Sequence, residues 1–111
     1  MMSDLSKKKC KPCEGIGRKL SEDEVVGHCH QLDGWKFNKK DQIIEKCFKF
    51  KDYYEVMAFV NAVAWVSHCE DHHPELVVNY DNCLVRYSTH ALGGLTENDF
   101  ICASKVSDLI G

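Results

Sequence analysis

Helix-start motifs alternate with pairs of strand-like segments along this chain, and that order limits the fold more than any other feature of the sequence. Ser21 and Asp52 each stand three residues before a glutamate, the pattern of a capping box at a helix N-terminus. Residues 96–99 have the polar composition of a third helix start. Between these motifs, short apolar segments joined by polar turns predict two hairpins.

The spacing of apolar residues gives the expected elements. We expect helices over residues 22–30, residues 53–70 and the segment that starts at residue 96. We expect one hairpin from residues 35–38 and 43–50, and a second from residues 76–80 and 83–88. Together these elements predict an α+β fold, a two-layer sandwich in which a four-stranded antiparallel sheet carries the helices on one face. The predicted order is α-β-β-α-β-β-α.

Two details of the helices can be checked directly against a structure. Pro74 is expected to stop the second helix, because the residue before a proline is driven toward extended geometry. In the last helix, the expected buried side chains are Ile101, Val106, Leu109 and Ile110.

The length and the charge of the chain bound its class. With 111 residues, the chain has the size of one domain. We expect residues 1–18, which are rich in lysine and show no apolar period, to be a mobile arm, and residues 19–111 to form a single domain.

A net charge of -3 excludes the basic surface typical of direct nucleic-acid binding. No apolar run approaches the ~20 residues of a membrane helix, so no membrane partner is expected.

Cysteines are numerous and odd in number, which argues against a disulfide framework. They occupy positions 10, 13, 29, 47, 69, 83 and 102. Because residues 1–11 are polar and rich in lysine, unlike a signal peptide, we expect free thiols and a cytoplasmic location, with which a nuclear presence is compatible. Cys10 and Cys13 form a lone Cys-x-x-Cys motif. A structural zinc site normally needs a second such pair, so the role of this motif stays open.

Three histidines form the candidate reactive group: His72, His73 and His90. Histidine can both give and take a proton near neutral pH. The predicted hairpin between His73 and His90 can bring its two ends together, so that the three imidazoles meet in one site. This arrangement indicates acid–base chemistry on a small molecule.

The spacing of these residues resembles the pattern of the pterin-4a-carbinolamine dehydratase family. His72-His73-Pro74 is followed after five residues by Tyr80, after nine more by His90 and after eight more by Asp99. The resemblance extends from about residue 20 to the end of the chain. One element departs from the family pattern, because His68 occupies the position of an acidic residue.

The resemblance implies a reaction and a set of residues for it. The family removes water from a 4a-hydroxy-tetrahydropterin to give quinonoid dihydropterin, a hydro-lyase step of tetrahydrobiopterin recycling, and it needs no metal and no organic cofactor. The implied catalytic residues are His72, His73 and His90, and which of them donates the proton stays open. The implied substrate wall consists of Asp71, His72, His73, Pro74, Ser88, Thr89, His90 and Ala91. Asp99 and His68 are the candidates for orienting a histidine.

Two alternatives to this interpretation are a metal site and a function without catalysis. His68 and His72 lie four residues apart on a predicted helix, which is a spacing of metal ligands. A zincin motif would need a glutamate where Cys69 stands, so we predict no metal site. The alternative function is that of some animal relatives, which stabilise the dimer of a homeodomain transcription factor without catalysis. The family forms dimers and tetramers, so a homodimer or homotetramer is expected.

Overall fold

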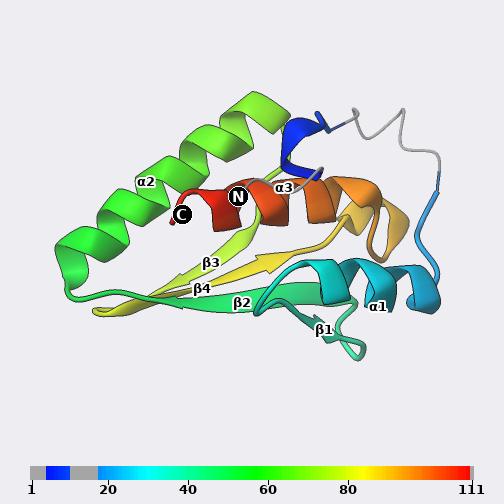
Figure 1. Cartoon of the computed structure of the whole chain (residues 1–111), viewed down its shortest axis with the longest axis horizontal. Helices are drawn as coiled ribbons and strands as arrows, with labels where there is room; N and C mark the ends of the chain where they lie inside the picture. The colour runs from blue at the N-terminus through cyan, green and yellow to red at the C-terminus, as the bar shows by residue number, and fades with distance from the viewer. Residues whose placement is uncertain (1–4, 11–17, 111) are drawn as a thin grey trace.

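A four-stranded antiparallel sheet lies beneath helices in the computed structural model of this protein, which describes residues 5–10 and 18–110 (Figure 1). The elements in chain order are η1 (Leu5–Lys7), α1 (Glu22–Gln31), β1 (Lys36–Asn38), β2 (Ile43–Lys49), α2 (Tyr53–Glu70), β3 (Glu75–Val78), β4 (Asn82–Tyr87), η3 (His90–Leu92) and α3 (Glu97–Asp108). The predicted α+β class and the order α-β-β-α-β-β-α are confirmed.

The order of the strands in the sheet is β1-β2-β4-β3, so the two hairpins meet through β2 and β4. Side chains alternate along β4 between the core and the outer face, as expected for a sheet covered on one side. On the outer face, the register places Arg86 opposite both Glu45 of β2 and Glu75 of β3. This register matters for the site, because it lines up the start of β3 with the end of β4.

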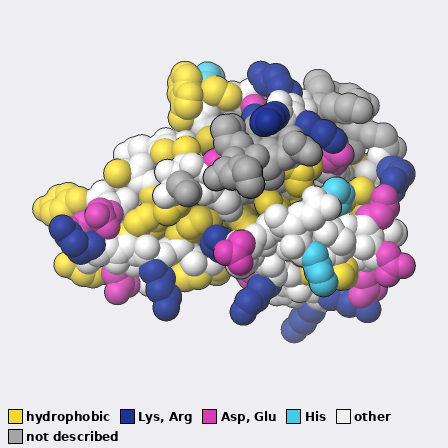
Figure 2. Space-filling view, in the orientation of Figure 1, with side chains coloured by type: hydrophobic (Ala, Val, Ile, Leu, Met, Phe, Trp, Pro, Cys, Tyr) yellow, Lys and Arg dark blue, Asp and Glu magenta, His cyan; other side chains and the backbone are white. Residues whose placement is uncertain are grey.

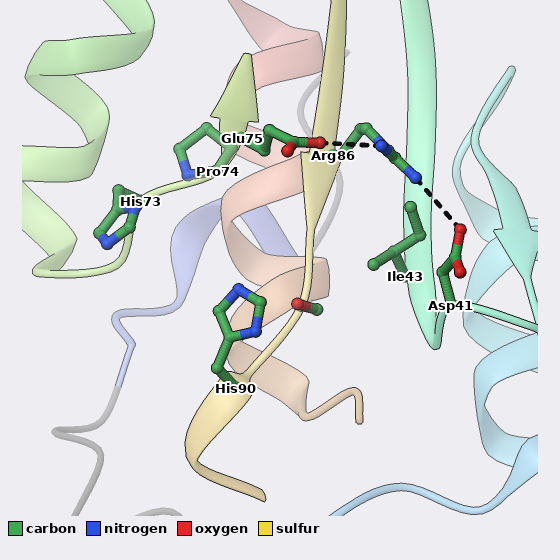
Figure 3. A pocket seen from close by; sticks show the side chains of 8 residues that line it. Asp41, Ile43, His73, Pro74, Glu75, Arg86 and His90 are labelled. Atoms are coloured by element: carbon green, nitrogen blue, oxygen red, sulfur yellow. Dashed lines mark hydrogen bonds and ion pairs between the residues drawn. The ribbon is translucent and has the colours of Figure 1, made fainter. Parts of the chain in front are cut away.

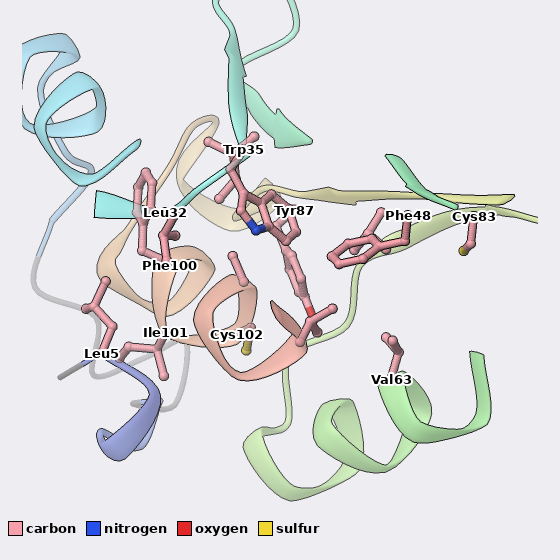
Figure 4. Close-up of a cluster of buried hydrophobic side chains, with 14 of the residues drawn as sticks. Leu5, Leu32, Trp35, Phe48, Val63, Cys83, Tyr87, Phe100, Ile101 and Cys102 are labelled. Atoms are coloured by element: carbon pink, nitrogen blue, oxygen red, sulfur yellow. The ribbon is translucent and has the colours of Figure 1, made fainter. Parts of the chain in front are cut away.

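The core lies between the covered face of the sheet and the helices α2 and α3 (Figure 4). The sheet contributes Ile44, Phe48, Cys83, Val85 and Tyr87, α2 contributes Val56, Phe59 and Val63, and α3 contributes Phe100, Ile101, Cys102, Ala103 and Val106. All of these side chains are buried, and they form one continuous cluster. Burial of this apolar area is the main force that holds the helices on the sheet.

The helix starts agree with the predicted capping motifs, with one difference. At α1, Ser21 and Glu24 make both bonds of a capping box. At α2, the side chain of Asp52 accepts a hydrogen bond from the N–H of Glu55 at 2.9 Å. The carboxylate of Glu55 accepts from the N–H of Lys51 at 2.8 Å, one residue before the N–H that a capping box would use. The expected box at Asp52 is therefore only half formed.

Helix α2 covers the predicted residues 53–70, but the chain leaves the helix before it reaches Pro74. The last helical residue is Glu70, and Asp71 adopts the left-handed conformation with φ 52° and ψ 43°. Aspartate tolerates this conformation better than most residues. The backbone therefore leaves the helix at Asp71, and the chain carries His72 toward the core before it reaches the proline.

At the C-terminal end, the prediction for two side chains is wrong. Ile101 and Val106 are buried as expected, but Leu109 and Ile110 are 42% and 54% exposed. Helix α3 ends at Asp108, so these two residues lie beyond its last turn and leave the buried stripe of the helix.

Near the N-terminus, residues 5–10 contact α3. Leu5 is buried in the core cluster, and Cys10 packs against that cluster. The mobility expected for residues 1–18 stays a prediction; residues 1–4 and 11–17, which include Cys13, lie outside the described residues. Within the part of the chain that the structure describes, no helix has the length and apolar character needed to cross a bilayer.

Candidate active site

One cavity of about 320 Å³ collects nearly all of the predicted site residues. The register of the β3–β4 hairpin pairs Glu75 with Arg86, so the segment before β3 lies beside the segment after β4. These segments carry His73 and His90. The residues that line the cavity are Asp71, His72, His73, Ser88, Thr89, His90 and Ala91. The hairpin thus brings together residues that are far apart in the sequence.

His72 is buried beside the carboxylate of Asp99. Its Nε2 lies 2.6 Å from Oδ1 of Asp99, and the two side chains are 8% and 0% exposed. A carboxylate hydrogen-bonded to one ring nitrogen fixes the orientation of an imidazole. Since Nε2 is occupied in this way, His72 can exchange a proton with a ligand only through Nδ1.

Asp99 is held in place by further hydrogen bonds. Its Oδ2 accepts from the hydroxyl of Thr89 at 2.8 Å and from the N–H of Thr96 at 3.0 Å. Thr96 is the N-cap of α3 and Asp99 is the third residue of that helix, so the same carboxylate completes the capping box. A negative charge at a helix N-terminus is also favoured by the helix dipole. Asp99 therefore lies at a helix start beside a histidine, where it was expected.

The face of the His72 ring rests on Tyr87. The two ring centroids are 5.7 Å apart and the planes differ by 11°. Tyr87 is fully buried in β4. Burial raises the pKa of its phenol above the ordinary range, so the side chain stays neutral and serves as an apolar platform. Sequence reasoning missed this contact, because Tyr87 looked like any apolar residue of a strand.

His73 and His90, unlike His72, are exposed. They line the cavity from its two sides, one from the loop before β3 and the other from the start of η3. In Figure 3, His73 lies next to Pro74 and His90 lies on the segment that follows β4. These two imidazoles are therefore accessible to a small molecule in the cavity, and His72 lies beneath them.

A second cavity of about 370 Å³ adjoins the first. It is lined by Asp41, Ile43, His73, Pro74, Glu75, Arg86, Ser88 and His90. His73, Ser88 and His90 line both cavities, so the two form one continuous hollow. Pro74, the predicted wall residue that the first cavity lacks, belongs to this second one.

Sequence reasoning did not find Asp41, Glu75 and Arg86 as site residues. Glu75 and Arg86 face each other across the predicted hairpin, and that pairing was the available signal. Asp41 gave no signal, because the turn between β1 and β2 reaches this wall only in the folded sheet.

His68 and Tyr80 lie away from the candidate site. His68 is exposed, and its ring centroid is 5.3 Å from that of Trp65 on the same helix. Neither cavity includes it, so its expected orienting role stays a prediction that no contact of this residue supports. Tyr80 is 68% exposed in the turn between β3 and β4, at the opposite end of the hairpin from the histidines.

Residues 5–10 and 18–110 contain no group of three or more histidines, cysteines, aspartates or glutamates that is arranged to hold a metal ion. The spacing of His68 and His72 does not lead to such a group either, because one side chain is exposed and the other is buried against Asp99.

Comparison with known proteins points to one family. Residues 18–109 match the family model described as pterin 4 alpha carbinolamine dehydratase. A protein of Nitrosospira multiformis that bears the name pterin-4-alpha-carbinolamine dehydratase is 56% identical, and the match covers 97% of this chain and 94% of that protein. A protein of the same name from Legionella pneumophila strain Corby is 50% identical, and the match covers 99% of this chain and 98% of that protein. A solved structure titled transcriptional coactivator/pterin dehydratase, from Brucella melitensis, has a TM-score of 0.81 and 33% identity, covering 85% of this chain and 100% of its own.

Proposed function

Since the chain belongs to the pterin-4a-carbinolamine dehydratase family, we propose that it removes water from 4a-hydroxy-tetrahydropterin to give quinonoid dihydropterin, as a hydro-lyase of tetrahydrobiopterin recycling. The observation that carries this proposal is the meeting of His72, His73 and His90 at one cavity. A scaffold without catalysis would not need three imidazoles around a hollow of this size.

The reaction needs two proton transfers, and the cavity offers groups for both. As the C4a–O bond breaks, the leaving oxygen takes a proton, and N5 gives one up as the C4a–N5 double bond forms. We assign these transfers to His73 and His90, because both are exposed to the cavity from opposite sides. A positioned acid or base of this kind contributes about 10²–10⁴-fold to the rate.

His72 acts from below this pair. Its ring is fixed by Asp99 on one edge and by Tyr87 on one face, so it presents Nδ1 in a constant direction. A fixed hydrogen-bonding group costs no reorganisation when charge develops on the substrate. We therefore assign His72 to the catalytic set, with Asp99 as its positioning residue.

The remaining wall suits recognition of the pterin ring. Asp71 is exposed and lines the cavity directly before the histidines. Its carboxylate can accept hydrogen bonds from the amino and amide N–H groups of a pterin, an interaction that a charged acceptor strengthens. The stretch from Ser88 to Ala91 forms the opposite wall and offers backbone groups.

A stopped-flow assay with chemically generated 4a-hydroxy-tetrahydropterin tests the function. We expect the purified protein to accelerate dehydration without added metal, and the His73→Ala/His90→Ala double variant to fall close to the uncatalysed rate. Activity that disappears with a chelator and returns with zinc would contradict the mechanism proposed here.

A homo-oligomer is proposed on separate grounds. Figure 2 shows apolar side chains gathered on the face formed by α2 and the end of α3. Exposed apolar residues of these elements include Tyr54 (82%) and Trp65 (66%) of α2 and Ile110 (54%) just after α3. Apolar patches of this kind mark protein–protein contacts. Analytical ultracentrifugation of the wild type and of Trp65→Lys tests it, because we expect the substitution to favour the monomer.

The alternative function is that of a dimerisation cofactor for a homeodomain transcription factor. It rests on the family resemblance and on the solved structure from Brucella melitensis, which is described as a transcriptional coactivator as well as a pterin dehydratase. Full dehydratase activity of the isolated protein favours the enzyme. An inactive protein that forms a complex with a homeodomain factor in a pull-down would favour the alternative.

A further inference from the structure

Two cysteines that the proposed reaction does not use lie in contact with each other. The Sγ atoms of Cys10 and Cys102 are 3.4 Å apart, although the residues are 92 positions apart in the sequence. The N–H of Cys10 donates to Glu70 at 2.8 Å, and Glu70 pairs with Lys105 at 3.4 Å. This anchoring holds the two thiols in contact.

We propose that Cys10 and Cys102 form a reversible disulfide under oxidation by a peroxide, which fastens residues 5–10 to α3. Cys10 reacts first, because it is half-buried whereas Cys102 is fully buried. Its thiolate attacks the peroxide and the O–O bond breaks, which gives a sulfenic acid and a hydroxide that takes up the proton released by the thiol to become water. The sulfur of Cys102 then displaces the hydroxyl as a second water, so two thiols lose two electrons and hydrogen peroxide becomes two waters.

The environment of Cys102 supports this order of events. The hydrogen bond with Cys10 and burial raise the pKa of the Cys102 thiol far above its ordinary value. Its thiolate is therefore scarce until Cys10 is oxidised. In a reducing cytosol such a pair stays reduced, and a disulfide would form transiently on oxidative challenge.

Peptide mapping without reductant, after treatment of the full chain with hydrogen peroxide, tests the proposal. We expect a Cys10–Cys102 peptide that is lost with dithiothreitol, a Tm raised by several degrees because a long loop is closed, and slower tryptic cleavage at residues 7–9. Cys102→Ser should abolish all three effects, and Cys47→Ser, at an exposed strand position, should keep them. Oxidation that joins Cys10 to Cys13, or that leaves Cys102 free, would overturn the proposal.

Discussion

His72 and Asp99 form a buried pair, with Nε2 of the histidine 2.6 Å from Oδ1 of the aspartate. The same carboxylate receives hydrogen bonds from Thr89 and from the N–H of Thr96. One side chain therefore links the start of α3, the end of β4 and the histidine segment before β3. Such a link positions the candidate site and also stabilises the fold.

Substitution Asp99→Asn tests both roles. A neutral amide oxygen accepts a weaker hydrogen bond than a carboxylate, and its NH₂ group would face one of the donors that now point at Oδ1 and Oδ2. We expect kcat to fall about 10–10²-fold and the free energy of unfolding to fall by about 1–3 kcal/mol. Stopped-flow kinetics and urea unfolding measure the two effects. Asp23→Asn, in the exposed first turn of α1, is the control, and kcat equal to that of the control would remove Asp99 from the mechanism.

Substitution of His73 or His90 by alanine should separate activity from stability. Both side chains are exposed, so their loss removes few packing contacts. We expect turnover to fall about 10²-fold or more in each variant, with Tm nearly unchanged. His30→Ala, another exposed histidine, is the matched control for a general loss of imidazole. A normal rate in either cavity variant would exclude that residue as a proton-transfer group.

His68→Glu restores the acidic residue of the family pattern and tests whether this position is coupled to the site. His68 is exposed and packs beside Trp65, so a charge there is screened from the buried His72. We expect the pH–rate profile to move by less than about 0.5 pH unit, which corresponds to less than about 0.7 kcal/mol. His68→Gln controls for the loss of the ring. A clear upward shift of the acid limb would show that position 68 does orient the histidines.

Glu70→Gln tests a pH-dependent part of the stability. Burial on its own raises the pKa of Glu70, but the N–H of Cys10 and the ammonium of Lys105 outweigh it, so the pKa lies below its ordinary value. A pKa that is lower in the folded state than in the unfolded state contributes to the stability of the fold. This contribution is complete above the unfolded pKa of ~4.3, and it is lost as the pH falls through the folded pKa. We expect the variant to be about 1–2 kcal/mol less stable at pH 7 and the difference to shrink toward pH 3. Urea unfolding at both pH values measures this, and a constant difference would refute the charge effect.

The sequence by itself determined the elements of the fold. Local signals sufficed for this, because a capping box such as Ser21 with Glu24 and the apolar spacing of α2 act over a few residues. The histidine set was also visible, since its spacing along the chain resembles a family pattern and the hairpin between His73 and His90 follows from strand signals.

The tertiary structure decided which of these histidines are buried and what surrounds them. His72 differs from its neighbour His73 because the left-handed Asp71 turns the chain inward, toward Asp99 on a helix that begins 25 residues later. The second cavity needed the sheet register that sets Arg86 among Glu45, Glu75 and Asp41, and the contact of Cys10 with Cys102 needed the packing of residues 5–10 on α3. Such contacts join residues distant in sequence, and they form only when burial of the common core brings their elements together.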